Sequence, residues 1–283
     1  MRTHYSWTLP QVSIALGART IVMGILNLTP DSFSDGGLYN DRSKAIARAL
    51  EIEAQGADIL DIGGESSRPG STAISEDEEL RRVVPIVEAL RGKVHIPISI
   101  DTYRSEVARR SLAAGAQIVN DISAFRFDPA MLEVSASYRA AVILMHSRGG
   151  RDELHLQPPM ASAVDQVRQD LGKSIHSAVA AGVEKTAIVI DPGIGFGKRA
   201  EESLSLLRNV KALSPLECPV LIGTSRKSFI RKIARIEPGT PYDPAWGTAA
   251  TVAAAIVQGA HIVRVHDVKE IRTLVDVLDA IVE

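Results

Sequence analysis

The feature that most constrains the fold is a pattern that the chain repeats eight times, a short run rich in Ile and Val followed by a longer amphipathic run. The short runs are TIVMGILN, ADILDIGG, IPISIDT, QIVNDIS, AAVILMHS, AIVIDPG, CPVLIGTS and HIVRVHD. Nearly continuous apolar strands indicate a sheet that is covered on both faces, so we expect parallel strands joined by helical crossovers. Segments between them, such as DRSKAIARALEIEAQG and DQVRQDLGKSIHSAVAAG, have apolar residues at helical spacing and end in Gly.

This repetition predicts an α/β fold of the (β/α)8 TIM-barrel type. The chain has 283 residues, and roughly 250 residues are typical of such a barrel. Residues 1–19 precede the first unit, and we expect them to form an N-terminal extension or hairpin that closes the barrel floor. No linker composition divides the chain, so one domain spanning residues 1–283 is predicted. A doubly wound open sheet is the alternative.

Charge and cysteine content exclude several classes of protein. The 32 basic and 34 acidic residues are spread along the chain, so no nucleic-acid or membrane partner is expected and any anionic ligand must be held locally. Cys218 is the single cysteine, which excludes an intramolecular disulfide and indicates a reducing compartment, by default the cytoplasm. We expect no signal peptide, and no uncharged apolar run approaches the roughly 18 residues of a membrane helix.

Polar side chains follow every predicted strand. In a barrel the carboxyl ends of the strands meet at one mouth, where enzymes of this fold place their active sites. A single Asp after a strand often only caps the next helix, and Asp61 and Asp121 are open to that interpretation. The whole set predicts one sub-site for a ligand with several N–H donors and another for an anion. The strand-end residues are Asn27, Asp61, Asp101, Asn120, Asp121, His146, Asp191, Ser225, Arg226, Lys227, Arg264, His266 and Asp267.

Three further features of the sequence concern a loop, a nucleotide and a metal. DSFSDGG, residues 31–37, is polar and ends in two glycines, which predicts a mobile loop directly after the first strand. GIGFGK, residues 193–198, fits neither the Walker spacing nor a dinucleotide fingerprint, which argues against ATP and NAD. His146 and His155 have no organised partner for a structural zinc site.

Seven motifs together resemble the motif series of the dihydropteroate synthases, in order and one at each of seven strand ends. They are MGILNLTPDSFSDGG, DIGGESSRPG, SIDT, VNDI, DPGIGFGK, GTSRKSFI and RVHDV, between about Thr20 and Val268. The resemblance implies a pterin-binding TIM-barrel transferase of folate synthesis. Such an enzyme condenses 6-hydroxymethyl-7,8-dihydropterin diphosphate with p-aminobenzoate, with early loss of diphosphate, to give 7,8-dihydropteroate. It also implies a homodimer, with which the small residues of TAATVAAAIVQGAH are compatible.

The resemblance implies a role for each matching residue. The pterin-binding set is Asp101, Asn120, Asp191 and Lys227. The diphosphate-binding set is Asn27, Arg68, Arg264 and His266, with Asn27 as the ligand to Mg2+. The p-aminobenzoate-binding set is Phe33, Ser67, Pro69, Phe196, Arg226 and Ser228, and the loop carrying Phe33 would shield a cationic intermediate from water. The residues expected to act in catalysis are Asp101, Lys227, Arg68, Arg264 and His266.

Some positions depart from the family pattern. Ser67 stands where many members have Thr, Ile194 replaces an aromatic residue of some members, and MHSRGG differs from the usual sequence. Sulfonamides imitate p-aminobenzoate and inhibit ordinary members, so the resemblance also implies a sulfonamide target. None of these changes removes a residue assigned to the pterin or the diphosphate.

Three alternative functions stay open at this point. A pterin-dependent corrinoid methyltransferase domain shares the barrel but has no diphosphate to hold. A non-catalytic pterin-binding paralogue gains little from a full set of anion ligands. A sugar-phosphate isomerase or aldolase on the same barrel explains the cations but not the pairing of Asp191 with Asn120.

Overall fold

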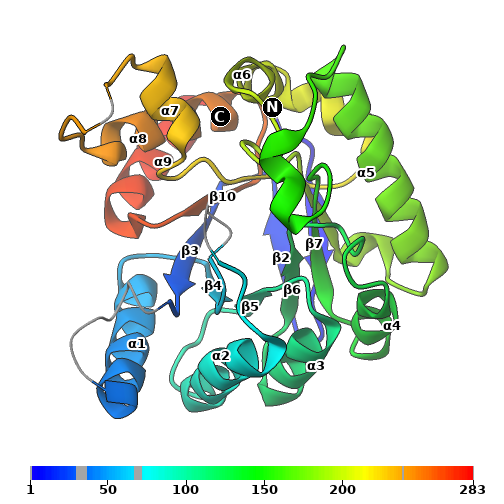
Figure 1. The fold of residues 1–283 in the computed structure, drawn as a ribbon, viewed down its shortest axis with the longest axis vertical. Helices are drawn as coiled ribbons and strands as arrows, with labels where there is room; N and C mark the ends of the chain where they lie inside the picture. The colour runs from blue at the N-terminus through cyan, green and yellow to red at the C-terminus, as the bar shows by residue number, and fades with distance from the viewer. Residues whose placement is uncertain (1, 30–36, 67–71, 238, 283) are drawn as a thin grey trace.

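The computed structural model describes residues 2–29, 37–66, 72–237 and 239–282, and it contains an eight-stranded parallel barrel (Figure 1). The strands lie in the order β8-β7-β6-β5-β4-β3-β10-β9, and a parallel bridge between Ile190 and Val220 connects the two ends of this order. The barrel prediction is therefore confirmed, and the doubly wound open sheet is wrong. The strands are β3 (Ile21–Asn27), β4 (Ile59–Gly63), β5 (Ile98–Asp101), β6 (Ile118–Asp121), β7 (Ala141–Met145), β8 (Ile188–Asp191), β9 (Leu221–Ile222) and β10 (Ile262–Val265).

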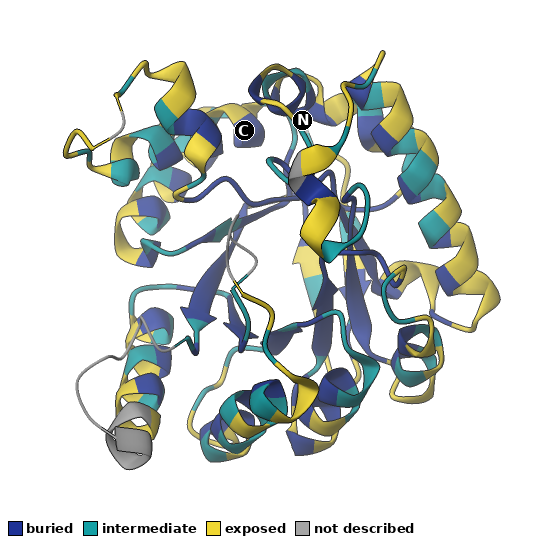
Figure 2. Ribbon diagram, in the orientation of Figure 1, coloured by how far each residue is buried: buried dark blue, intermediate teal, exposed yellow. Residues whose placement is uncertain are grey.

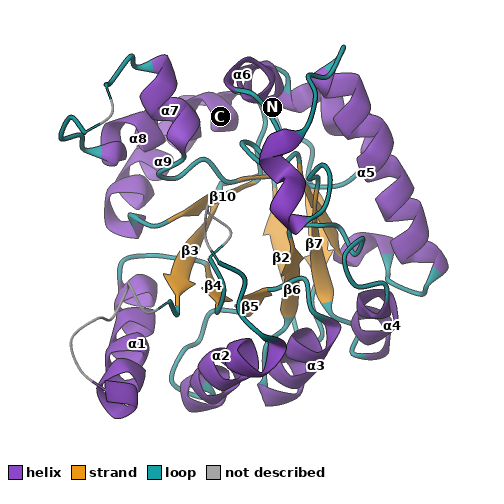
Figure 3. Cartoon of the chain, viewed as in Figure 1, coloured by secondary structure: helices purple, strands orange, loops and turns teal. Residues whose placement is uncertain are grey.

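Helices surround the strands, as Figure 3 shows. They are α1 (Gly37–Ala54), α2 (Glu76–Leu90), α3 (Ser105–Ala114), α4 (Ala130–Ser137), α5 (Ala163–Ala180), α6 (Ala200–Arg208), α7 (Ser228–Ile233), α8 (Pro244–Val257) and α9 (Val268–Val282), with 3-10 helices η2 (Arg151–Leu156), η3 (Lys185–Ala187) and η4 (Val210–Leu216). Side-chain caps begin several of them. Ser75, for example, accepts a hydrogen bond from the backbone N–H of Glu78 at 3.2 Å.

The start of α1 corrects one prediction. Gly37, expected in the loop after the first strand, is the first residue of this helix. The helical pattern of the amphipathic segment therefore extends further toward the N-terminus than its apolar residues indicated. The remainder of the predicted loop, residues 31–36, lies outside the described residues.

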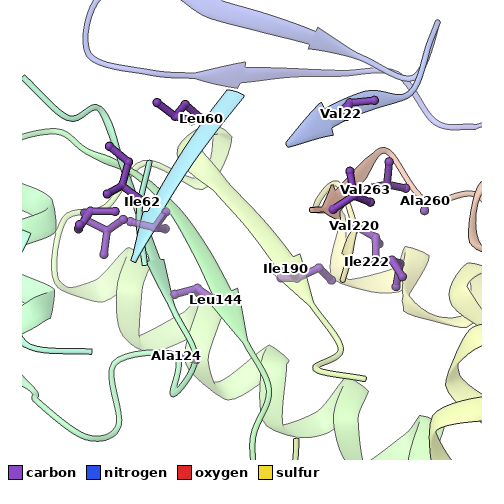
Figure 4. Packing of buried hydrophobic residues seen from close by; sticks show 14 of the residues in the cluster. Val22, Leu60, Ile62, Ala124, Leu144, Ile190, Val220, Ile222, Ala260 and Val263 are labelled. Carbon is purple, nitrogen blue, oxygen red and sulfur yellow. The ribbon is translucent and has the colours of Figure 1, made fainter. Parts of the chain in front are cut away.

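The strands bury two different faces. Leu60, Ile62, Leu144 and Ile190 belong to the large core cluster between the sheet and the helices, and Figure 4 labels them. Neighbouring strand residues belong to a second cluster at the amino ends of the strands, which includes Met23, Ile59, Ile118, Ile143 and Val189. Side chains alternate between the faces of a strand, so the apparently continuous apolar runs conceal a period of two. Figure 2 shows the strands of the barrel largely buried, with exposed positions on the outer surfaces of the helices.

An N-terminal hairpin closes the floor of the barrel, as predicted. It consists of β1 (Tyr5–Thr8) and β2 (Ser13–Leu16), which pair antiparallel. Trp7 is fully buried in the second cluster, and its indole Nε1 donates a hydrogen bond to the carbonyl of Ala187 at 2.9 Å. This hairpin thus fills the lower end of the barrel and leaves the carboxyl ends of the strands to form the mouth.

Among the helices that the structure describes, we find none long and apolar enough to cross a membrane.

Candidate active site

A hydrogen-bond network centred on Arg264 and Asp61 links four strands across the barrel mouth. Its Nε donates to Asp61 Oδ2 and its Nη2 donates to Asp101 Oδ2, both at 2.6 Å. Asn120 Nδ2 donates to the same oxygen of Asp61 at 3.2 Å. These residues come from β10, β4, β5 and β6, so the predicted convergence of polar strand ends on one mouth is observed for this group.

Burial sets the electrostatics of this network. Burial and the neighbouring charge of Asp61 together raise the pKa of Asp101 to about 7, although the attraction of Arg264 opposes the rise. Burial opposes the charge of Arg264, but Asp61 and Asp101 outweigh it and raise the pKa of Arg264 above its usual value. The guanidinium therefore stays charged, and Asp101 is the group poised to exchange a proton near neutral pH.

Asp191, Lys227 and Phe196 form the second part of the mouth. The carboxylate of Asp191 accepts a hydrogen bond from the backbone N–H of Gly193 at 2.7 Å. Burial raises the pKa of Asp191, and the charge of Lys227 is the main opposing effect. Burial likewise lowers the pKa of Lys227 to about 8 against the pull of Asp191. Lys227 Nζ donates to the carbonyl of Ile194 and lies 4.5 Å from the centre of the Phe196 ring.

His266 and Asn27 lie together at the third part. His266 Nδ1 is 2.9 Å from Ser225 Oγ, and its Nε2 is 3.5 Å from Asn27 Nδ2. A Cβ atom at Gly63 would lie 3.5 Å from Asp101 Cβ and 3.8 Å from Asn27 Oδ1. These are ordinary van der Waals distances, so Gly63 lies between the Asn27 side and the Asp101 side of the mouth.

The predicted p-aminobenzoate residues are only partly described. Arg226 is paired with Asp267, to which its Nε donates at 3.2 Å, and its side chain is 44% exposed. Ser228 is exposed at the first position of α7. Phe196 lies against Lys227, as described above. Phe33, Ser67 and Pro69 lie outside the described residues, as does Arg68 of the diphosphate-binding set.

The two aspartates for which a helix-capping role was considered, Asp61 and Asp121, serve different purposes. Asp61 was open to a helix-capping role, yet it is fully buried at the centre of the Arg264 network. Asp121 instead accepts hydrogen bonds from the backbone N–H groups of Ser123 at 2.6 Å and Phe125 at 3.1 Å. Its role is local, as considered, but it stabilises a turn and does not cap α4, which begins at Ala130. The period-two pattern distinguishes them, because Asp61 lies two residues after the inward-facing Ile59.

His146 also differs from the strand-end residues of the mouth. Its Nε2 is 3.4 Å from Asp170 Oδ2 on α5, and burial lowers the pKa of His146 to about 3. A histidine in this position remains neutral across the physiological range. It therefore joins β7 to the helical layer and is not part of the charged network described here.

Comparison with known proteins identifies the family. The profile of the family described as "Pterin binding enzyme" matches residues 23–266. A dihydropteroate synthase from Synechocystis is 48% identical over 265 residues, which cover 94% of this chain and 91% of that protein. The chain belongs to the dihydropteroate synthase family.

Solved structures of dihydropteroate synthases also match the barrel. The Clostridium difficile enzyme, solved in the presence of pteroic acid, is 44% identical with a TM-score of 0.87, over 94% of this chain and 98% of that one. The Yersinia pestis enzyme, solved in a complex with a sulfonamide drug, is 38% identical with a TM-score of 0.88, over 98% of each chain. Both the sequence and the fold of this chain are thus those of the dihydropteroate synthase family.

Proposed function

We propose that this protein joins 6-hydroxymethyl-7,8-dihydropterin diphosphate to p-aminobenzoate, and so forms 7,8-dihydropteroate and diphosphate. The observation that carries the proposal is the composition of the mouth, where buried carboxylates and an amide lie beside Arg264 and Lys227. Membership of the dihydropteroate synthase family supports it. A sugar-phosphate enzyme would have no use for such an array of acceptors.

The acceptors suit the flat edge of a dihydropterin. Its amide and amino N–H groups can be accepted in pairs by a carboxylate, which we assign to Asp191. Asn120 and Asp101 would complete the edge. Lys227, whose pKa is influenced by the charge of Asp191, would donate to the pterin carbonyl and ring nitrogen.

The cations suit the leaving group. The bond between the pterin methylene carbon and the diphosphate oxygen breaks, and its electron pair leaves with the diphosphate. The aniline nitrogen of p-aminobenzoate then forms a bond to the cationic methylene and loses a proton. We assign Arg264, His266 and Arg68 to the diphosphate, because charge that builds on its oxygens is the main quantity to stabilise.

Asn27 is the residue that we assign to Mg2+. Among residues 2–29, 37–66, 72–237 and 239–282, no group of three or more His, Cys, Asp or Glu forms a metal cluster. A single amide oxygen fits this hard cation, because Mg2+ usually keeps several waters and binds substrate phosphates. When bound, the ion would neutralise charge on the diphosphate.

The p-aminobenzoate would lie over Phe196, near the rim residues Arg226 and Ser228. The family assigns Phe33, Ser67 and Pro69 to the same ligand. We infer that sulfonamides compete for this position, as the resemblance implies.

A homodimer in the cytoplasm is the expected state of the protein. The packed helices α8 and α9 carry exposed apolar side chains that a second copy would cover. These side chains are Trp246, Val257, Val277 and Ile281. We further propose that residues 1–283 act as one domain.

The test is diphosphate release by the purified protein with Mg2+ and the dihydropterin diphosphate, in the presence or absence of p-aminobenzoate. Sustained release that needs both substrates, with an equal amount of dihydropteroate, is expected. Pterin binding without release would favour a methyltransferase domain or a binding protein instead.

A further inference from the structure

The glycine-rich motif that fits no nucleotide-binding fingerprint encloses its own lysine. Lys198 Nζ donates to the backbone carbonyls of Gly193 at 2.8 Å, Phe196 at 3.0 Å and His146 at 3.0 Å. Only a charged ammonium offers three N–H donors, so this geometry is that of the cation. One side chain thereby fastens the segment after β8 to the end of β7.

The glycines permit this cage. Gly193, Gly195 and Gly197 have φ values of 67°, 82° and 66°, in the left-handed region that favours glycine. A Cβ atom at Gly193 would lie 1.9 Å from the carbonyl oxygen of His146. Any side chain at Gly193 would therefore displace the carbonyl that Lys198 binds.

The caged segment also carries three groups of the mouth. Asp191 accepts a hydrogen bond from the N–H of Gly193. The carbonyl of Ile194 accepts one from Lys227, whose ammonium lies over the Phe196 ring. A shift of this segment would consequently move the partners of both Asp191 and Lys227.

We propose that Lys198 is a positioning residue for the reaction, which holds residues 193–198 in the conformation that arranges Asp191, Lys227 and Phe196 for the substrates. This inference rests on the proposed function. It gives the GIGFGK motif a role in which the carbonyls of a glycine-rich loop bind a cation, whereas nucleotide loops use their N–H groups to bind phosphate.

Charge adds a second consequence. Burial and the charges of Lys227 and Arg148 lower the pKa of Lys198 well below its usual value, whereas Asp191 and Glu202 oppose this effect. The three carbonyl acceptors around Nζ match the charged form, so we take Lys198 as the cation. At Asp191, burial raises the pKa, and Lys227, the N–H of Gly193, Lys198 and Arg264 oppose the rise. Removal of the Lys198 charge therefore raises the pKa of Asp191 further. If pterin binding requires ionised Asp191, a variant without the Lys198 charge should lose that binding at a higher pH than the wild type as the solution is acidified.

The test uses Lys198→Met, which keeps the length of the side chain but removes its charge and donors. We expect kcat/KM for the dihydropterin diphosphate to fall by about 10- to 100-fold, because small displacements of reacting groups can cost this much. The acid limb of the pH profile should move to higher pH. Lys198→Gln keeps N–H donors without the charge, so it should retain more kcat/KM yet show the same displacement of the acid limb.

Lys185→Met is the matched control. Lys185 also donates to a carbonyl, that of Leu216 at 2.7 Å, but it lies in η3 before the amino end of β8. This variant should keep the kinetics and pH profile of the wild type. Thermal unfolding checks the fold of each variant, and Lys198→Gln carries the test if Lys198→Met does not fold.

Equilibrium titration with the dihydropterin diphosphate separates the two proposals. A wild-type protein that binds the pterin but never turns over contradicts the proposed function. Lys198 variants that keep wild-type pterin affinity and an unshifted pH dependence overturn the role of Lys198. Equal losses of kcat/KM in the Lys198 and Lys185 variants would also overturn the role of Lys198, since they would indicate general destabilisation.

Discussion

The floor and the mouth of the barrel are built on the same strands with opposite chemistry. At the floor, Trp7 packs among the apolar strand residues and its one donor is satisfied by Ala187. At the mouth, carboxylates are buried beside cations, and Asp61 Oδ1 has no hydrogen-bond partner among the residues that the structure describes. Ile59 and Asp61 lie two residues apart on the same face of β4, so one strand contributes an apolar side chain toward the floor and a carboxylate toward the mouth.

The largest effect is expected from a substitution in the floor of the barrel. Trp7→Ala removes a fully buried side chain and should lower the free energy of unfolding by about 3–5 kcal/mol, as large-to-small core changes do. Urea denaturation measures the loss. Trp7→Phe keeps an aromatic ring but not the hydrogen bond, so it should lower the free energy of unfolding by less than Trp7→Ala does. The KM values of folded enzyme should remain those of the wild type, and a changed pterin KM would contradict the division between floor and mouth.

The next largest effect is expected from a substitution in the mouth of the barrel. Asp191→Ala removes the carboxylate assigned to the pterin and leaves ligand donors unpaired, so pterin binding should weaken by about 2–5 kcal/mol. Calorimetric titration with the dihydropterin diphosphate measures the loss. Asp121→Ala is the matched control, because Asp121 is also fully buried but its carboxylate accepts hydrogen bonds from Ser123 and Phe125 of the following turn. It should lower stability and leave pterin affinity intact, and similar affinities in both variants would refute the assignment.

The stability contributed by Asp101 at the mouth should depend on pH, whereas that of the floor should not. The pKa of Asp101 rises on folding from 3.8 to about 7, so the folded state holds this proton more tightly than the unfolded state. Its contribution to stability is present below about pH 4 and is lost as pH rises toward 7. Relative to Asp101→Asn, the wild type should therefore lose stability across this window. Chemical denaturation at several pH values measures the difference, and the Trp7→Phe difference should show no such dependence on pH.

The smallest effect is expected at the rim. Arg226 and Asp267 form a partly exposed ion pair, and pairs of this kind usually contribute about 0.2–1 kcal/mol. Arg226→Ala should thus change stability little and raise the KM for p-aminobenzoate only a few-fold. Steady-state kinetics at low and high salt measure the change. A loss of p-aminobenzoate binding as large as the loss of pterin binding in Asp191→Ala would place Arg226 among the essential groups of the mouth.

The sequence predicted the elements well for a physical reason. Each strand is a run of Ile and Val and each helix repeats at its own period, so local pattern alone locates them. It predicted an N-terminal extension or hairpin at the floor from the residues left over before the first unit. It placed Gly37 in a loop because the apolar pattern of α1 starts later than the helix does. The residues of the mouth were identified through their position at strand ends and through the family motifs.

What the sequence determined by itself is the barrel, the family and the set of polar residues at the mouth. The tertiary structure alone decided which of these side chains meet. Asp61 bonds Arg264 while Asp121 caps a turn, His146 faces α5, and the glycine-rich segment encloses Lys198. Such pairings depend on which face of each strand points inward and on how the closed barrel staggers its strands. Neither can be read from one strand in isolation.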